Sequence, residues 1–214
     1  PFGSGAHHAT VCMGLAATKS EGHDLAPLCC YMTREAVAIQ DTWNVSGLRG
    51  TGSCHFEVRD TFVPAAHTHG FTAYTPSQPG LLYRMPALST FAWTVSVVPL
   101  GIARGAIDAF VELAGAKSRL GTTTLLRDRE TVQATVGRAE ASYHAARAFL
   151  IDAMTELMVA TDLGGAQLVR MRAMFRAACA HAAESAVHIV QALVADAGAV
   201  AIFESCALER AMRN

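Results

Sequence analysis

The chain has 214 residues, 51% of them apolar, and its 17 basic and 18 acidic side chains leave a formal charge of −1. A nearly neutral chain has no overall field that favours nucleic acid or an anionic membrane surface. Its six cysteines are scattered without a C-x-x-C pair, so we expect reduced thiols in a cytoplasmic protein. The first residues lack a basic segment and a long apolar run, and polar residues interrupt the apolar segment 186–203, so we expect neither a signal peptide nor a membrane span.

The first part of the chain, residues 1–66, favours β-structure. Short extended runs occupy 10–17, 28–33 and 36–40. After the loop DTWNVSGLRGTGS at 41–53, apolar residues alternate with polar ones, as in a half-buried strand. A phosphate-binding loop needs a helix start at this point, whereas the sequence here predicts a strand. We therefore expect the loop glycines to be turn and bulge residues.

The rest of the chain is predicted to be a linker, 67–84, followed by helices. Apolar residues repeat at intervals of three and four over 86–117, 128–161 and 166–197, which predicts three long amphipathic helices. Pro99 is expected to kink the first helix or to mark its start, and Gly198 to cap the third. Three helices do not close a four-helix bundle, so we expect a fourth from beyond residue 214 or from another subunit.

The order of these segments resembles a known family. FGSG with His8, then DTWNVSGLRGTGS, a strand ending in FVP, GIARGAIDAF and IFESCALERAMRN together resemble the acyl-CoA dehydrogenase superfamily. The pattern D-T-W-x-x-x-G-L-R-G-T-G-S resembles its flavin-dependent monooxygenase branch, the oxygenase components of two-component aromatic hydroxylases. The resemblance implies an α+β fold with a partial, β-barrel-like middle domain at 1–66 and an up-and-down helical bundle at 85–214. It also implies a longer native chain, with a further N-terminal domain and a C-terminal segment.

The same resemblance implies a cofactor, partners and site residues. Reduced FMN or FAD would come from a separate NAD(P)H-flavin reductase, the substrate would be an aromatic, phenolic small molecule, and the subunits would form a homo-oligomer, a dimer of dimers. Ser4 and Gly5 match the position beside the isoalloxazine ring, where a hydroxyl or N–H can bond N5 or O4. Lys117 replaces the family's flavin-phosphate arginine without its bidentate fork, so Arg119 is the candidate to substitute for it. Arg49 is expected to be structural or interfacial.

Other candidates lie on the predicted helices. Phe91 and Trp93 could line an aromatic-substrate pocket or belong to the core. Tyr83 and Arg84 precede the first helix and could reach the substrate. The catalytic residues stay unassigned.

Two further groups of polar residues favour structural roles. His181, Glu184 and His188 share a helix face, but their order differs from the Glu-x-x-His pairs of di-iron bundles, so we expect no metal site. Glu204 and Arg210 are expected to form an ion pair.

Two alternatives to the monooxygenase remain open. One is an acyl-CoA dehydrogenase that oxidises an acyl thioester with a glutamate base, although no Y-E-G-type glutamate is present. The other is a non-catalytic remnant that only oligomerises through its bundle. If the intact protein is a monooxygenase, we expect these 214 residues alone to bind flavin weakly and to hydroxylate nothing.

Overall fold

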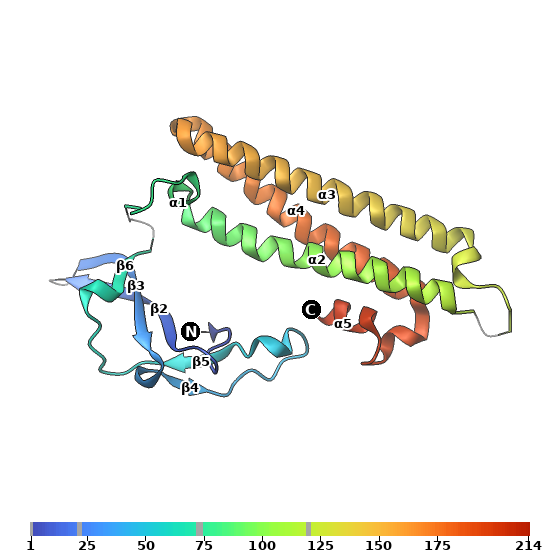
Figure 1. The fold of residues 1–214 in the computed structure, drawn as a ribbon, viewed down its shortest axis with the longest axis horizontal. Helices are drawn as coiled ribbons and strands as arrows, with labels where there is room; N and C mark the ends of the chain where they lie inside the picture. The colour runs from blue at the N-terminus through green and yellow to red at the C-terminus, as the bar shows by residue number, and fades with distance from the viewer. Residues whose placement is uncertain (1, 21–22, 72–74, 119–120) are drawn as a thin grey trace. The chain divides into compact units, whose positions relative to one another are not determined.

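The computed structural model describes residues 2–20, 23–71, 75–118 and 121–214. The chain divides into two compact units, which we call the β unit (residues 1–79) and the helical unit (residues 80–214) (Figure 1). Each unit has its own hydrophobic core and is described by itself.

The β unit contains two antiparallel sheets of three strands each. In the first sheet the central strand β5 pairs with β1 on one side and β4 on the other. In the second, β3 lies between β2 and β6. The strands are β1 (Phe2–Gly3), β2 (Val11–Ser20), β3 (His23–Thr33), β4 (Ala38–Gln40), β5 (Cys54–Glu57) and β6 (Thr68–Gly70), with single 3-10 turns at Arg34–Ala36, Arg49–Thr51 and Ala65–His67.

Strands form where the alternating pattern predicted them, but two short strands were not foreseen. The two-residue β1 and the three-residue β6 are too short to show a period, and each exists because a longer strand offers it a free edge. β6 lies inside the segment 67–84 that we predicted to be a linker. The mixed α and β class is confirmed, while the described residues form two small sheets and show no closed barrel.

The helical unit consists of three long helices and several short ones (Figure 1). α4 packs along both α2 and α3, and the short α5 packs against α2 and α4. The helical prediction is confirmed, and because Pro99 lies inside α2, the alternative that it marks the helix start is wrong. The elements are α1 (Leu81–Arg84), α2 (Ala87–Ala116), α3 (Glu130–Leu163), α4 (Gly165–Ala197) and α5 (Ala207–Arg213), with 3-10 turns at Leu126–Asp128 and Gly198–Ile202.

The core of the helical unit combines small and large side chains. Fully buried alanines, among them Ala103, Ala146 and Ala178, let the helix backbones approach closely, and Phe110 and Phe175 fill the space between them. α3 and α4 are joined at Gly164 and Gly165, whose φ angles of +68° and +58° favour glycine. The chain reverses there without a longer loop, so the two helices lie antiparallel.

Large apolar side chains also lie on the surface of the long helices. Phe91, Val95 and Val98 on α2 are between 52% and 70% exposed, and Val187 on α4 is 51% exposed. By length and composition alone, the stretches Ala87–Ala116 and Gly165–Ile202 could each cross a membrane, a test that core helices of soluble proteins also pass. The absence of a membrane span therefore stays a prediction. Exposed apolar faces of this kind are typical of surfaces that contact another protein or a membrane.

Candidate functional site

Pairing of β1 with β5 brings the two sequence motifs of the β unit together. Gly3 lies opposite Cys54 in the sheet, so the FGSG segment runs beside the end of the GLRGTGS loop. The Gly5 N–H then donates to the Thr51 carbonyl at 2.9 Å. A Cβ on Gly3 would come within 2.9 Å of the Phe56 ring, so this close approach requires glycine. The two motifs form one structural element.

Three hydroxyl groups form a directed chain across this junction. The Thr51 hydroxyl donates its proton to the Leu48 carbonyl at 2.9 Å. Each hydroxyl has one proton, so Ser53 must be the donor in its 2.7 Å contact with Thr51 Oγ1. By the same reasoning Ser4 must donate to Ser53 Oγ, also at 2.7 Å. Because Ser4 is exposed and its proton is used, its Oγ offers only acceptor lone pairs to solvent or a ligand.

The loop itself holds an unusual backbone. Gly52 has a φ of +52°, as the prediction of turn glycines requires, but Leu48 also has a φ of +52° although it is not glycine. The Leu48 carbonyl accepts hydrogen bonds from Trp43 Nε1 at 3.1 Å and from the Thr51 hydroxyl. These bonds fix the turn that ends the hydroxyl chain. Arg49, at the exposed start of the 3-10 turn, stays a structural or interfacial prediction.

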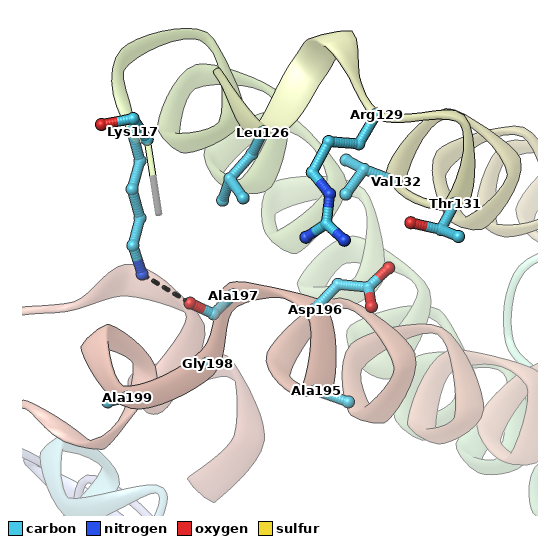
Figure 2. A pocket seen from close by; sticks show the side chains of 11 residues that line it. Lys117, Leu126, Arg129, Thr131, Val132, Ala195, Asp196, Ala197, Gly198 and Ala199 are labelled. Atoms are coloured by element: carbon cyan, nitrogen blue, oxygen red, sulfur yellow. Dashed lines mark hydrogen bonds between the residues drawn. The ribbon is translucent and has the colours of Figure 1, made fainter. Parts of the chain in front are cut away.

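A pocket of about 560 Å³ lies in the helical unit where the end of α2 meets the end of α4. Figure 2 shows the Lys117 ammonium at this pocket, where it donates to the Ala197 carbonyl at 2.7 Å. A cation at the carbonyl end of a helix is stabilised by the helix dipole. One of the three N–H groups of the Lys117 ammonium is therefore used in a hydrogen bond within the protein. The role of Lys117 toward a flavin phosphate stays a prediction. Arg119 lies outside the described residues.

A second cation in this pocket, Arg129, was not predicted from the sequence. Figure 2 shows the Arg129 guanidinium directed toward the side of α4 that carries Asp196. Arg129 precedes α3 at its N-terminus, and its only sequence signal was proximity to a predicted helix start. Asp196 and the carbonyl end of α4 offset part of the charge of the two cations, so the pocket keeps a net positive charge.

The aromatic and polar candidates at the start of the helices have different environments. Trp93 is half-buried and stacks on Phe175 with ring centroids 6.4 Å apart. This agrees with the alternative that Trp93 belongs to the core. Phe91 and Tyr83 are each 52% exposed. The Arg84 guanidinium forms an ion pair with Asp162 and so ties α1 to α3. Their roles toward a substrate stay predictions.

The predicted helix-face trio lies on exposed positions of α4. His181, Glu184 and His188 are all exposed, and the His181 ring lies 3.5 Å from the Ser185 hydroxyl. In the C-terminal segment, the ion pair recorded at 2.6 Å joins Glu209 to Arg213 rather than Glu204 to Arg210. The spacing of four residues on one turn of α5 explains this pairing.

The main charge cluster of the helical unit links α2 to α3. Arg104 makes two hydrogen bonds to the Glu140 carboxylate, at 2.7 and 3.0 Å, and also binds Asp108 at 2.7 Å. Its guanidinium lies 5.4 Å from the centre of the Tyr143 ring. Hydrogen bonding by Arg104 lowers the pKa of Glu140 below its ordinary value, and the carboxylates raise the pKa of Arg104. The cluster is a structural clamp between helices.

Comparison with known proteins gives consistent matches. Residues 93–214 match the family described as "Acyl-CoA dehydrogenase, C-terminal domain". The indole-3-acetate monooxygenase of Pseudomonas putida is 29% identical over 202 residues, which are 94% of this chain and 51% of that protein. HsaA of Rhodococcus jostii (strain RHA1), a flavin-dependent monooxygenase oxygenase subunit, is 35% identical over 125 residues, 55% of this chain and 33% of that protein.

A solved structure extends the comparison to three dimensions. XiaF from a Streptomyces species, in complex with FADH2 and glycerol, superposes on this chain with a TM-score of 0.87 at 25% sequence identity. The superposition covers 100% of this chain and 56% of the XiaF chain. The chain thus spans about half the length of the relatives that it matches. Both relatives are named as monooxygenases, HsaA as a flavin-dependent one, and XiaF holds FADH2, which confirms the resemblance read from the motifs.

Proposed function

Because the chain belongs to the acyl-CoA dehydrogenase family, whose C-terminal domain its residues 93–214 match, we propose that the whole protein is the oxygenase component of a flavin-dependent monooxygenase. Its substrate is an aromatic, phenolic small molecule, and reduced FMN or FAD reaches it from a separate NAD(P)H-flavin reductase. Bound reduced flavin would supply the two electrons that activate O2, so that one oxygen atom of O2 enters the substrate and the other leaves as water.

The observation that carries this proposal is the direction of the hydroxyl chain. Ser4 donates to Ser53, so its free lone pairs can only accept a hydrogen bond. N5 of a reduced flavin carries hydrogen and donates, whereas N5 of an oxidised flavin only accepts. The acceptor lone pairs of Ser4 therefore suit the N5–H donor of the reduced ring. The Gly5 N–H is already bonded to the Thr51 carbonyl, so Ser4 is the group at this position that is available to the flavin.

The helical unit supports the remaining parts of the proposal. Lys117, with Arg119 beside it in sequence, supplies cationic side chains for a flavin phosphate. The exposed apolar residues Phe91, Val95 and Val98 of α2 would be covered by another subunit, in a homo-oligomer built as a dimer of dimers. In the complete chain, further strands would extend the two sheets into the barrel-like middle domain of the family. The protein is proposed to act in the cytoplasm.

The experiment is an anaerobic titration of the full-length protein with reduced and oxidised FMN and FAD. Wild-type protein should bind the reduced form of its flavin more tightly than the oxidised form. Ser4→Ala should weaken binding of the reduced form by about two- to tenfold, the value of one hydrogen bond, and leave the oxidised form almost unchanged. Addition of O2 and a phenol should then yield a hydroxylated product. Equal affinity for both redox states in the wild type would contradict the assignment of Ser4.

The two rival functions give different results in the same preparation. An acyl-CoA dehydrogenase would reduce its flavin with an acyl thioester and hydroxylate no phenol. A non-catalytic remnant would have a native mass of 22.6 kDa and bind neither flavin. The names of the relatives favour oxygen transfer over dehydrogenation.

A further inference from the structure

Three potential metal ligands converge at one end of the sheet β1-β5-β4. His7 Nε2 lies 3.3 Å from Cys54 Sγ, and Asp41 Oδ1 lies 3.6 Å from the same sulfur. All three ligand atoms lie within 4.8 Å of one another. Among the residues that the structure describes, no other group of three His, Cys, Asp or Glu side chains meets this condition.

The backbone fixes this convergence. Cys54 is the first residue of the central strand β5 and pairs with Gly3 of β1. On the other side of β5, Gln40 of β4 pairs with His55. Because these strands are antiparallel, Asp41, which follows Gln40, lies opposite Cys54, which precedes His55. His7 lies within the turn that the His8 N–H closes by donating to the Gly5 carbonyl at 2.9 Å. Each ligand thus comes from a different segment of one small sheet.

The spacing fits a tetrahedral zinc-type ion. With a Zn–S distance of about 2.3 Å and Zn–N or Zn–O distances of about 2.0–2.1 Å, tetrahedral angles place the sulfur about 3.5 Å from each of the other ligand atoms. The two distances measured from Cys54 Sγ are 3.3 and 3.6 Å. A cation could therefore bind all three atoms with only small movements of the side chains.

The chemistry of the trio favours the same ion. Cys54 is 1% exposed, and its single thiol proton cannot serve both His7 and Asp41, whereas one cation accepts lone pairs from all three. A thiolate, an imidazole and a carboxylate form a donor set that suits Zn²⁺ and not Mg²⁺ or Ca²⁺, which prefer oxygen ligands. His7 and Asp41 are exposed, which gives the ion a path of entry and leaves a fourth position for water.

We propose that His7, Asp41 and Cys54 bind a zinc-type divalent cation that ties the FGSG segment to β5. Binding exchanges the thiol proton of Cys54 for the metal, and the sulfur is ligated as thiolate. The site lies close in sequence to Ser4 and Ser53, but it does not require flavin and is independent of the proposed oxygenase activity. The ion would make the position of the FGSG segment less dependent on the two-residue strand β1.

The test uses the full-length protein, stripped with a chelator and kept free of flavin. Titration with Co²⁺ should produce thiolate-to-cobalt charge-transfer absorption in the near ultraviolet, and Zn²⁺ should displace it. Cys54→Ser should abolish this absorption, whereas the matched control Cys206→Ser, in the helical unit, should keep it. His7→Ala and the nearly isosteric Asp41→Asn should each weaken Co²⁺ binding by at least about tenfold.

Two results would overturn the proposal. One is the lack of thiolate-to-cobalt absorption in the wild-type protein at saturating Co²⁺. The other is absorption that persists in Cys54→Ser, which would assign it to another thiol. Asp41→Asn keeps the shape of the side chain, and its unchanged circular dichroism would separate loss of binding from loss of fold. As a second readout, Zn²⁺ should slow alkylation of Cys54 in the wild type but not in Asp41→Asn.

Discussion

The two units of this protein hold their important side chains in place by different means. In the β unit a small core, centred on Cys12, Met32, Val37 and Phe56, supports loops whose polar atoms are fixed by hydrogen bonds. In the helical unit two large apolar clusters fix the helices, and polar contacts such as that of Arg104 join them at the surface. We therefore expect substitutions in the β unit to affect mainly ligand binding, and substitutions in the helical unit to affect mainly stability.

This difference leads to opposite expectations for substitutions. Loss of a buried side chain in the helical unit should cost stability and change ligand selectivity little. Loss of one hydroxyl in the β unit should cost less stability and change which ligand is bound. Single substitutions in the full-length protein test this separation.

The largest effect is expected for Phe175→Ala. Phe175 is fully buried between the helices and stacks on Trp93, so its removal leaves a cavity and should reduce the free energy of unfolding by about 3–5 kcal/mol. Denaturant unfolding followed by circular dichroism measures this loss. The matched control is Phe91→Ala, which removes a 52% exposed ring of the same type and should cost much less. Similar losses for both variants would show that the Phe91 face is buried in the assembly.

A smaller loss of stability, but a change in selectivity, is expected for Ser53→Ala. Ser53 is 6% exposed and links Ser4 to Thr51, so its loss should reduce the free energy of unfolding by about 1–2 kcal/mol. It also releases the Ser4 proton, so Ser4 can donate as well as accept. The preference for reduced over oxidised flavin should then diminish in the anaerobic titration.

The control for this change is Thr61→Ala in the same unit. Its hydroxyl also donates to a carbonyl, that of Arg59 at 2.9 Å, but at an exposed position outside the hydroxyl chain. This variant should keep both the stability and the flavin preference of the wild type. If Ser53→Ala also keeps the flavin preference, the direction of the hydroxyl chain does not determine selectivity.

The sequence predicted the helical unit better than the β unit, for a physical reason. A helix of about thirty residues repeats its apolar pattern many times, so the ends of α3 and α4 were located within two residues. Strands as short as β1 and β6 depend on the partner that they meet, and that partner is distant in sequence. Local patterns cannot show such pairings.

The same limit applies to the candidate site. Ser4 was identified because its motif resembles a family, but its bond to Ser53, 49 residues away, has no local signature. The trio of His7, Asp41 and Cys54 was missed for the same reason, since 47 positions separate His7 from Cys54 in the sequence. The bond from Lys117 to the Ala197 carbonyl likewise depends on how α2 and α4 end side by side.

A moderate effect is expected for Gly5→Ala, which separates backbone strain from packing. Gly5 has a φ of +71°, and a Cβ there would meet no atom within 4 Å, so the cost is the left-handed backbone alone, about 1 kcal/mol. Gly3→Ala has no such φ, but its Cβ would lie 2.9 Å from the Phe56 ring and should cost more, by displacing β1. Thermal unfolding of both variants checks the order, and a larger loss for Gly5→Ala would show that its surroundings are filled in the complete protein.

The smallest effect concerns the clamp between α2 and α3 and depends on pH. Hydrogen bonding by Arg104 lowers the pKa of Glu140 in the folded state below its ordinary value of 4.5. A lowered pKa stabilises the fold above pH 4.5, and this contribution is lost as the pH falls through the folded value. Because the Glu140 side chain is 37% exposed, screening limits the contribution to no more than about 1 kcal/mol.

Glu140→Gln should therefore lower the free energy of unfolding at pH 7 by that amount and have a progressively smaller effect as the pH falls below 4.5. The control is Glu184→Gln, which replaces an exposed carboxylate on α4 outside the clamp and should leave the free energy of unfolding at pH 7 unchanged. High salt should reduce the effect of Glu140→Gln, since the Arg104 and Glu140 side chains are partly solvated. An effect that stays constant from pH 7 to pH 3 would mean that packing, and not charge, holds α2 to α3 at this point.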